Sequence, residues 1–136
     1  MSGSDRGSAS AELALLTPAL LALAMLMVLA GRVVDAGTTA DEAAHAAARA
    51  ASMERTVGAA QTAAASVSSQ TLAEHGRGCS DHSVALDHGG LAPGGAVTAV
   101  VECRVSLADL TGLGVPGGYT VRGESTAVVD TYRGQP

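Results

Sequence analysis

A single carboxylate at the start of a long apolar run is the residue whose position most demands a chemical role. Glu12 follows four small residues, Ser8 to Ala11, and precedes Leu13, where the apolar run begins. A carboxylate at the edge of hydrocarbon costs several kcal/mol unless a positive group partners it, so an acid there predicts a functional ion pair. The alternative is that Glu12 reaches the lipid headgroups and has no partner.

The two cysteines are the second candidate. A bond between Cys79 and Cys103 would close a loop of about 25 residues, worth roughly 3.5 kcal/mol on the chain-entropy model. A zinc site is the alternative, because His75, His82 and His88 crowd around Cys79, and the spacing of Cys79 and His82 could hold the metal. No second close pair of ligands accompanies them. We therefore predict a disulfide and no metal site.

Catalytic and nucleotide-binding motifs are absent from the sequence. It contains no G-x-S-x-G, P-loop, dinucleotide fingerprint or metalloprotease motif. The net charge is −5, and the eight cations, all arginine, are scattered along the chain, which argues against nucleic acid as a partner. Asp41 and Glu42 are better explained as charge on an exposed helix than as catalytic carboxylates. We predict no catalytic residues and no cofactor.

The apolar run has the length of a membrane-spanning helix. Glu12 and Arg32 leave 19 residues between them, or about 28 Å of helix against about 30 Å of hydrocarbon. A cleavable secretory signal ending near Ala30 is the alternative, but the run exceeds the roughly 7–15 residues of a signal core. Arg6 on one side and Arg32 on the other leave the orientation open on charge alone.

Gly7 and Glu12 together resemble a known processing site. Glutamate at the fifth position after a glycine is similar to the type IV prepilin cleavage site, and R-G-S-A-x-A-E-x-A-L-x-x-P resembles the start of TadE-like proteins. The resemblance implies that a prepilin peptidase cuts between Gly7 and Ser8 on the cytoplasmic side. It also implies that Glu12 pairs with the freed amine of a neighbouring subunit, which would neutralise both charges in low dielectric.

The first residues of the mature chain depart from those of major pilins. Ser8 stands where an aromatic residue commonly comes first, and Leu13 stands where phenylalanine commonly follows the glutamate. These departures favour a minor or priming subunit over the subunit of a main filament.

Beyond the apolar run, small residues recur at helical spacing. The stripe has the i, i+3, i+4, i+7 pattern of one helix face, with polar residues on the other face, and its members are Ala40, Ala43, Ala44, Ala47, Ala48 and Ala51. The spacing predicts one amphipathic helix over 34–72 that continues from the membrane segment. TadE-like proteins often carry an A-R-x-A motif here, much like Ala48 to Ala51.

Past Gly76 the pattern changes to short strands separated by glycine and proline. Ser83 to His88 is a candidate strand, residues 97–107 alternate with a period of two, and Tyr119 to Tyr132 forms a third strand with Gly123 as a possible bulge. Three such strands predict an antiparallel sheet packed on the helix, an α+β fold. The connection from Leu107 to Pro116 is apolar; it either touches a membrane or a partner subunit, or tucks under its own sheet, which we expect.

The predicted organisation has four parts. Residues 1–7 form a prepilin-type leader, 8–33 a transmembrane helix, 34–72 the alanine-rich helix and 80–136 a small extracytoplasmic β domain. With the resemblance, this predicts a non-catalytic minor pilin-like subunit, or pseudopilin, that assembles or primes a Tad/Flp-type pilus or a related export system. The chain would cross the cytoplasmic membrane once with its amino terminus in the cytoplasm.

The expected partners follow from the same resemblance. They are a prepilin peptidase, other pilin-like subunits, the Tad assembly platform and membrane lipid. Two alternatives stay open: a secreted binding protein released near Ala30 by signal peptidase, and a small zinc-binding protein.

Overall fold

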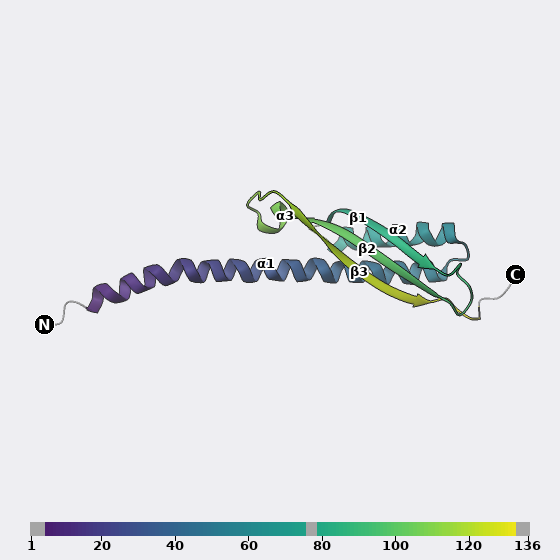
Figure 1. Ribbon diagram of the computed structural model, residues 1–136, viewed down its shortest axis with the longest axis horizontal. Helices are drawn as coiled ribbons and strands as arrows, with labels where there is room; N and C mark the ends of the chain where they lie inside the picture. The colour runs from purple at the N-terminus through teal and green to yellow at the C-terminus, as the bar shows by residue number, and fades with distance from the viewer. Residues whose placement is uncertain (1–4, 76–78, 133–136) are drawn as a thin grey trace. The chain divides into compact units, whose positions relative to one another are not determined.

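A computed structural model describes residues 5–75 and 79–132 of the 136. The chain forms a long helix, a second helix and three strands with a short helix between the last two (Figure 1). This architecture confirms the predicted α+β class. In order the elements are α1 (Asp5–Met53), α2 (Val57–His75), β1 (Cys79–His88), β2 (Ala96–Ser106), α3 (Leu107–Thr111) and β3 (Gly118–Val128).

The chain divides into two units, Met1–Arg32 and Val33–Pro136. Within the described residues, the first unit is the amino-terminal part of α1. Its helix continues through Pro18, whose ring nitrogen has no hydrogen to donate to a backbone carbonyl. The hydroxyl of Thr17 donates to the carbonyl oxygen of Leu13 at 2.7 Å. The helix therefore runs without interruption through the apolar segment.

The second unit contains one antiparallel sheet in the order β1-β2-β3. The alternation predicted for the middle strand is confirmed, because every second residue of β2 is buried and points toward the helices. The buried set is Val97, Ala99, Val101, Cys103 and Val105. The outer strands differ from the prediction at their ends: β1 begins at Cys79 instead of Ser83, and β3 ends at Val128 instead of Tyr132.

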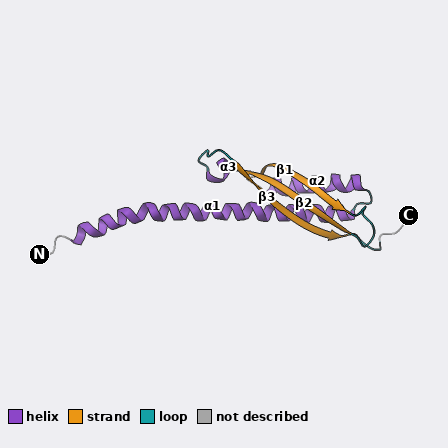
Figure 2. Ribbon diagram, viewed as in Figure 1, coloured by secondary structure: helices purple, strands orange, loops and turns teal. Residues whose placement is uncertain are grey.

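Small side chains fill the space between this sheet and the helices. Figure 2 shows the three strands, in orange, lying along α2 and the carboxy-terminal part of α1. All six alanines of the predicted stripe, from Ala40 to Ala51, are fully buried, which confirms that this face of the helix packs on a core. Ala60, Ala64 and Leu72 of α2 join the same core. Methyl groups allow the helices to approach the sheet closely, so a core without phenylalanine or tryptophan still excludes water.

The prediction of one helix over 34–72 is wrong, because α1 ends at Met53 and α2 begins at Val57. The hydroxyl of Thr56 accepts a hydrogen bond from the backbone N–H of Ala59 at 3.2 Å, as an N-cap residue does. The turn permits both helices to bury their alanine faces in one unit. A straight helix over 34–72 would leave the second stripe outside this core.

The predicted bulge at Gly123 is also wrong. The register of β2 and β3 is continuous through the pair Val101 and Gly123. A Cβ atom added at Gly123 would collide with the backbone of Ala40 in α1. Glycine is needed here because a helix backbone crosses directly against the strand, which is one of the recognised roles of glycine in a sheet.

The connection between β2 and β3 does not tuck under the sheet along its whole length. It begins with α3, in which Leu107 is half-buried, but Leu113 is 69% exposed and Val115 is 41% exposed. The expectation of a tucked connection is therefore wrong for its second half. Gly112, Gly114 and Gly117 have positive φ and turn the chain back toward β3.

Candidate functional site: the amino-terminal segment and the disulfide

The predicted processing site lies in the first turns of α1. Gly7 and Ser8 are helical, and Glu12 is helical and exposed. Residues 1–4 of the predicted leader lie outside the described residues. Positions 8 and 12 are four residues apart in the helix and therefore share a face. An exposed carboxylate on that face can accept hydrogen bonds from a cationic amine, which is the role that the resemblance assigns to Glu12.

The apolar run that follows Glu12 is exposed from Leu13 to Val28. From Leu13 to Val28 the large side chains are half or more exposed, for example 77% for Leu15 and 68% for Met27. Among the described residues, α1 is the helix long and apolar enough to cross a membrane, and the window of 18 residues that qualifies it is 0% buried. An unburied apolar surface of this length matches a hydrocarbon solvent, and α1 is therefore a candidate single membrane span.

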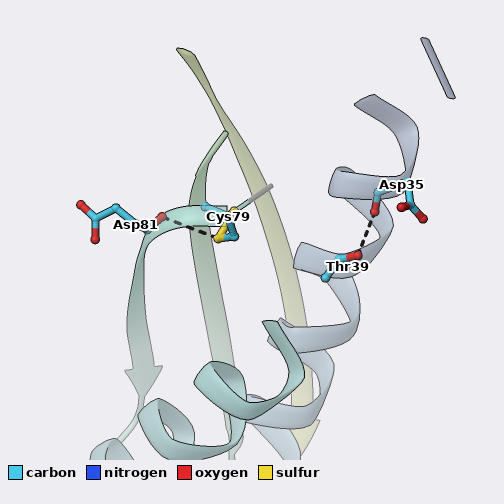
Figure 3. The surroundings of a disulfide bond; sticks show 5 residues. Asp35, Thr39, Cys79 and Asp81 are labelled. Atoms are coloured by element: carbon cyan, nitrogen blue, oxygen red, sulfur yellow. Dashed lines mark hydrogen bonds between the residues drawn. A yellow bond between two sulfur atoms is a disulfide. The ribbon is translucent and has the colours of Figure 1, made fainter. Parts of the chain in front are cut away.

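A disulfide between Cys79 and Cys103 ties the first residue of β1 to β2 (Figure 3). The S–S distance is 2.06 Å, the two Cα atoms are 5.5 Å apart, and Cys103 is only 3% exposed. In the sheet register Cys103 pairs with His82, and Cys79 pairs with Val105 after an irregularity between Cys79 and Asp81. The bond thus fixes the end of β1 where the strand pairing is irregular.

Helix α1 passes near this disulfide. In Figure 3 the turn carrying Asp35 and Thr39 lies beside the strand ends, and the Thr39 hydroxyl donates to the carbonyl oxygen of Asp35 at 2.9 Å. Cys79 Sγ lies 3.6 Å from the carbonyl oxygen of Asp81; a disulfide sulfur carries no proton, so this is a contact rather than a hydrogen bond. The disulfide therefore stabilises the end of the second unit at which α1 enters it.

The zinc alternative needs Cys79 as a thiolate, and the disulfide occupies that sulfur. The nearby histidines have separate surroundings: His75 Nδ1 lies 3.4 Å from the carbonyl oxygen of Thr71, and His88 Nδ1 accepts from the N–H of Gly90 at 3.3 Å. Within residues 5–75 and 79–132, no three side chains of the metal-binding types are arranged around one point. The geometry gives the zinc alternative no support.

Sequence reasoning missed an open groove between α1 and β3, of about 630 Å³. Its helix wall presents His45, Arg49 and Met53, and its strand wall ends at Asp130. His45 Nδ1 lies 3.0 Å from the Ser125 hydroxyl, which joins the two walls. The only signal in the sequence was the i, i+4 spacing of these three helix residues, since their meeting with Asp130 depends on how α1 docks against the sheet.

Residues 7–49 match the family model described as TadE-like protein. The matched stretch contains Gly7, Glu12, the apolar run and most of the alanine stripe, so it confirms the resemblance stated from the same residues. Comparison with curated proteins found no match. Comparison with solved structures found none either. The β sheet and α2 lie outside the matched stretch.

Proposed function

From the premise that residues 7–49 are TadE-like, we propose that the protein is a pilin-like minor subunit, or pseudopilin, which assembles or primes a Tad/Flp-type pilus or a related export system without catalysis of its own. The observation that carries the proposal is the order of features in one helix. A glycine and a glutamate five residues apart precede an exposed apolar run, which precedes a helix face buried in a folded domain.

Processing in this proposal hydrolyses the peptide bond between Gly7 and Ser8. A prepilin peptidase at the cytoplasmic face of the membrane would release the leader and leave a new α-amino group on Ser8. The carboxylate of Glu12 in a neighbouring subunit would then accept hydrogen bonds from that amine. Both charges lie at the edge of hydrocarbon, where their mutual attraction is much stronger than in water.

The disulfide supports the proposed topology. Cysteines remain oxidised outside the cytoplasm and are usually kept reduced inside it. The bond between Cys79 and Cys103 therefore fits a carboxy-terminal domain on the outer side of the cytoplasmic membrane. With one crossing, the amino terminus lies in the cytoplasm, where the peptidase acts.

The surface offered to neighbouring subunits is the apolar run and not the alanine stripe. Ala43 and Ala47 are 0% exposed because the sheet and α2 of the same chain cover them. By contrast, Leu20 is 63% exposed and Leu23 is 50% exposed. Contacts among subunits would therefore form within the membrane segment, where packing of helices does not compete with the domain's own core.

The test is the intact mass and N-terminal sequence of the mature protein, purified without reducing agent from the membrane fraction of its host. The expected chain begins at Ser8 and is two hydrogens lighter than its reduced form. A Gly7→Ala variant should keep its leader, because prepilin peptidases read the glycine before the cut. Gly3→Ala is the matched control and should be processed normally.

Two outcomes would contradict the proposal. A soluble chain that begins at Gly31 would identify the secreted binding protein released by signal peptidase. An unprocessed chain that stays in the membrane in the presence of an active prepilin peptidase would reject the pilin-like role.

A further inference from the structure

Two exposed apolar side chains extend from the connection between β2 and β3, residues 107–117. Leu113 is 69% exposed and Val115 is 41% exposed. Among these eleven residues Asp109 carries the one charge, and there is no cation. Residues 107–117 are called here the α3 loop.

The α3 loop is closed by its own backbone. The N–H of Leu107 donates to the carbonyl oxygen of Gly117 at 3.0 Å, and the N–H of Gly112 donates to the carbonyl oxygen of Ala108 at 2.9 Å. The N–H of Leu113 donates to the Thr111 hydroxyl at 3.3 Å. These bonds hold the turn in a shape that presents Leu113 outward, so its exposure is a property of the fold.

The α3 loop lies at the end of the second unit where α1 enters it. Gly123 of β3 contacts Ala40, and Ser125 lies beside His45, so β3 and α1 run in the same direction. From Ala40 back to Val33 the helix covers about 10 Å. From Gly123 back to the start of β3 the strand covers about 17 Å. The start of β3 therefore lies at the end of the second unit that begins with Val33.

Chain connectivity places Val33 close to the end of the apolar run. Val33 is three residues after Ala30, or about 4.5 Å along a helix. The headgroup region on each side of the hydrocarbon is about 5–8 Å thick. If α1 crosses the membrane as proposed above, Val33 falls in the headgroup region. Val34, which is 67% exposed, then adds to the apolar surface at this end.

We propose that the α3 loop is a membrane-contact site whose occupant is lipid: Leu113 and Val115 insert into the interfacial region of the bilayer that α1 crosses. Two aliphatic side chains on a loop without cations suit the boundary of headgroups and acyl chains, since burial there removes apolar area from water. The loop lies at the end of the second unit to which the chain of the proposed span is joined. This inference rests on the proposed membrane insertion and adds a second point of contact to it.

The experiment uses tryptophan, because the natural chain contains none. The full chain is reconstituted in phosphatidylcholine and phosphatidylglycerol vesicles as three single variants: Leu113→Trp, Met25→Trp in the apolar run, and Val128→Trp. Val128 is the matched control, since it is 71% exposed and lies at the opposite end of β3. Emission wavelength is measured, together with quenching by lipids brominated near the headgroup, by lipids brominated deep in the acyl chains, and by iodide in the water.

For a loop in the interface, shallow brominated lipid should remove on the order of half of the Leu113→Trp emission. The same variant should emit at shorter wavelength than Val128→Trp and be protected from iodide. Val128→Trp should be quenched by iodide and unaffected by brominated lipid. Circular dichroism and an unreduced mass two hydrogens below the reduced value verify that each variant is folded.

The failures of the two proposals are distinguishable. If Met25→Trp is not quenched by deeply brominated lipid, the span itself is absent, and the proposed function fails with it. If Met25→Trp is quenched but Leu113→Trp behaves like Val128→Trp, the lipid site alone is overturned. A short-wavelength emission of Leu113→Trp that ignores brominated lipid and disappears on dilution of protein in the vesicles would identify a second copy as the occupant, and would also overturn it.

Discussion

The two units of this chain use apolar residues in opposite ways. The first exposes leucine and methionine along a helix, with Leu21 and Met25 each 62% exposed, whereas the second builds its core from alanine and valine, among them Ala47 and Val101, which are both 0% exposed. In water, burying apolar side chains stabilises the second unit, whereas the long exposed apolar surface of the first unit is unfavourable. The contrast teaches that most large apolar side chains are kept outside the core of the domain, which small ones build. In the proposed function, the large side chains contact lipid and other subunits.

Small residues pack closely but bury little apolar area, so other interactions must contribute to the stability of the second unit. Alanine loses no side-chain entropy on burial, but each one removes little apolar area from water. The largest fully buried side chains in the described part of the chain are four valines and Ser68. A covalent bond and a close contact of backbones therefore matter more here than in a core rich in leucine and phenylalanine.

The largest expected effect is loss of the disulfide. Replacing Cys79 and Cys103 together by serine releases a loop whose ends are 24 positions apart, and should lower the free energy of unfolding of the second unit by about 3.5 kcal/mol. Denaturant titration of the full chain in micelles, followed by circular dichroism, measures this. Unreduced wild type and wild type in reducing agent are the references.

Loss of the disulfide should destabilise the second unit and leave the first unit unchanged. Helicity of the apolar run in micelles should survive the double variant, since the bond joins two residues of the second unit. Loss of helical signal from the whole chain, or a free energy of unfolding equal to that of the wild type, would contradict a role of the disulfide confined to the domain.

Close contact of backbones gives the second prediction. Gly123→Ala should lower the free energy of unfolding by about 3 kcal/mol, because the added methyl group must displace the backbone of Ala40. Gly37→Ala is the same chemical change in α1, where the added Cβ meets nothing within 4 Å. Gly37→Ala should raise stability by about 1 kcal/mol, since alanine favours helix over glycine.

The pair of glycine variants is measured by the same denaturant titration. If both variants shift stability in the same direction, the crossing of α1 over β3 at Gly123 is incorrect. Opposite signs would support the crossing, on which the position of the α3 loop also depends.

Features encoded by periodicity could be predicted from the sequence. The alternation in β2 and the stripe from Ala40 to Ala51 identified buried faces, and the apolar run identified the candidate span, because each depends on residues close together in the chain. The helix break at residues 54–56 could not be found in this way. Residues 54–56 contain neither proline nor glycine, so no local helix breaker marks the end of the first helix.

Features that depend on docking could not be predicted. The role of Gly123 requires knowing that α1 crosses β3, and the groove of His45 and Arg49 with Asp130 requires the same docking. In the amino-terminal segment, Gly7 and Glu12 were found from a local motif. Their cleavage and pairing remain proposals, because they involve a peptidase and a second subunit rather than contacts within this chain.

The smallest expected effect comes from replacing one leucine in each unit by alanine. Leu72 is 4% exposed and packs with Ala43, Ala44 and Val101, whereas Leu21 is 62% exposed. Leu72→Ala should lower the free energy of unfolding of the second unit by about 2.5 kcal/mol, near the low end for a buried leucine because its neighbours are small and can close part of the cavity. Leu21→Ala should change that quantity by less than about 0.5 kcal/mol.

Membrane association should be reduced more by Leu21→Ala than by Leu72→Ala, which is the reverse of their expected effects on stability. Leu21→Ala removes side-chain area from the exposed apolar run and should weaken retention in vesicles against extraction, while Leu72→Ala should leave retention unchanged. Flotation with vesicles measures retention, and denaturant titration measures stability. If Leu21→Ala destabilised the second unit as much as Leu72→Ala does, the apolar run would be part of the core of that unit. The proposed difference in role between the leucines of the run and the alanines of the core would then be rejected.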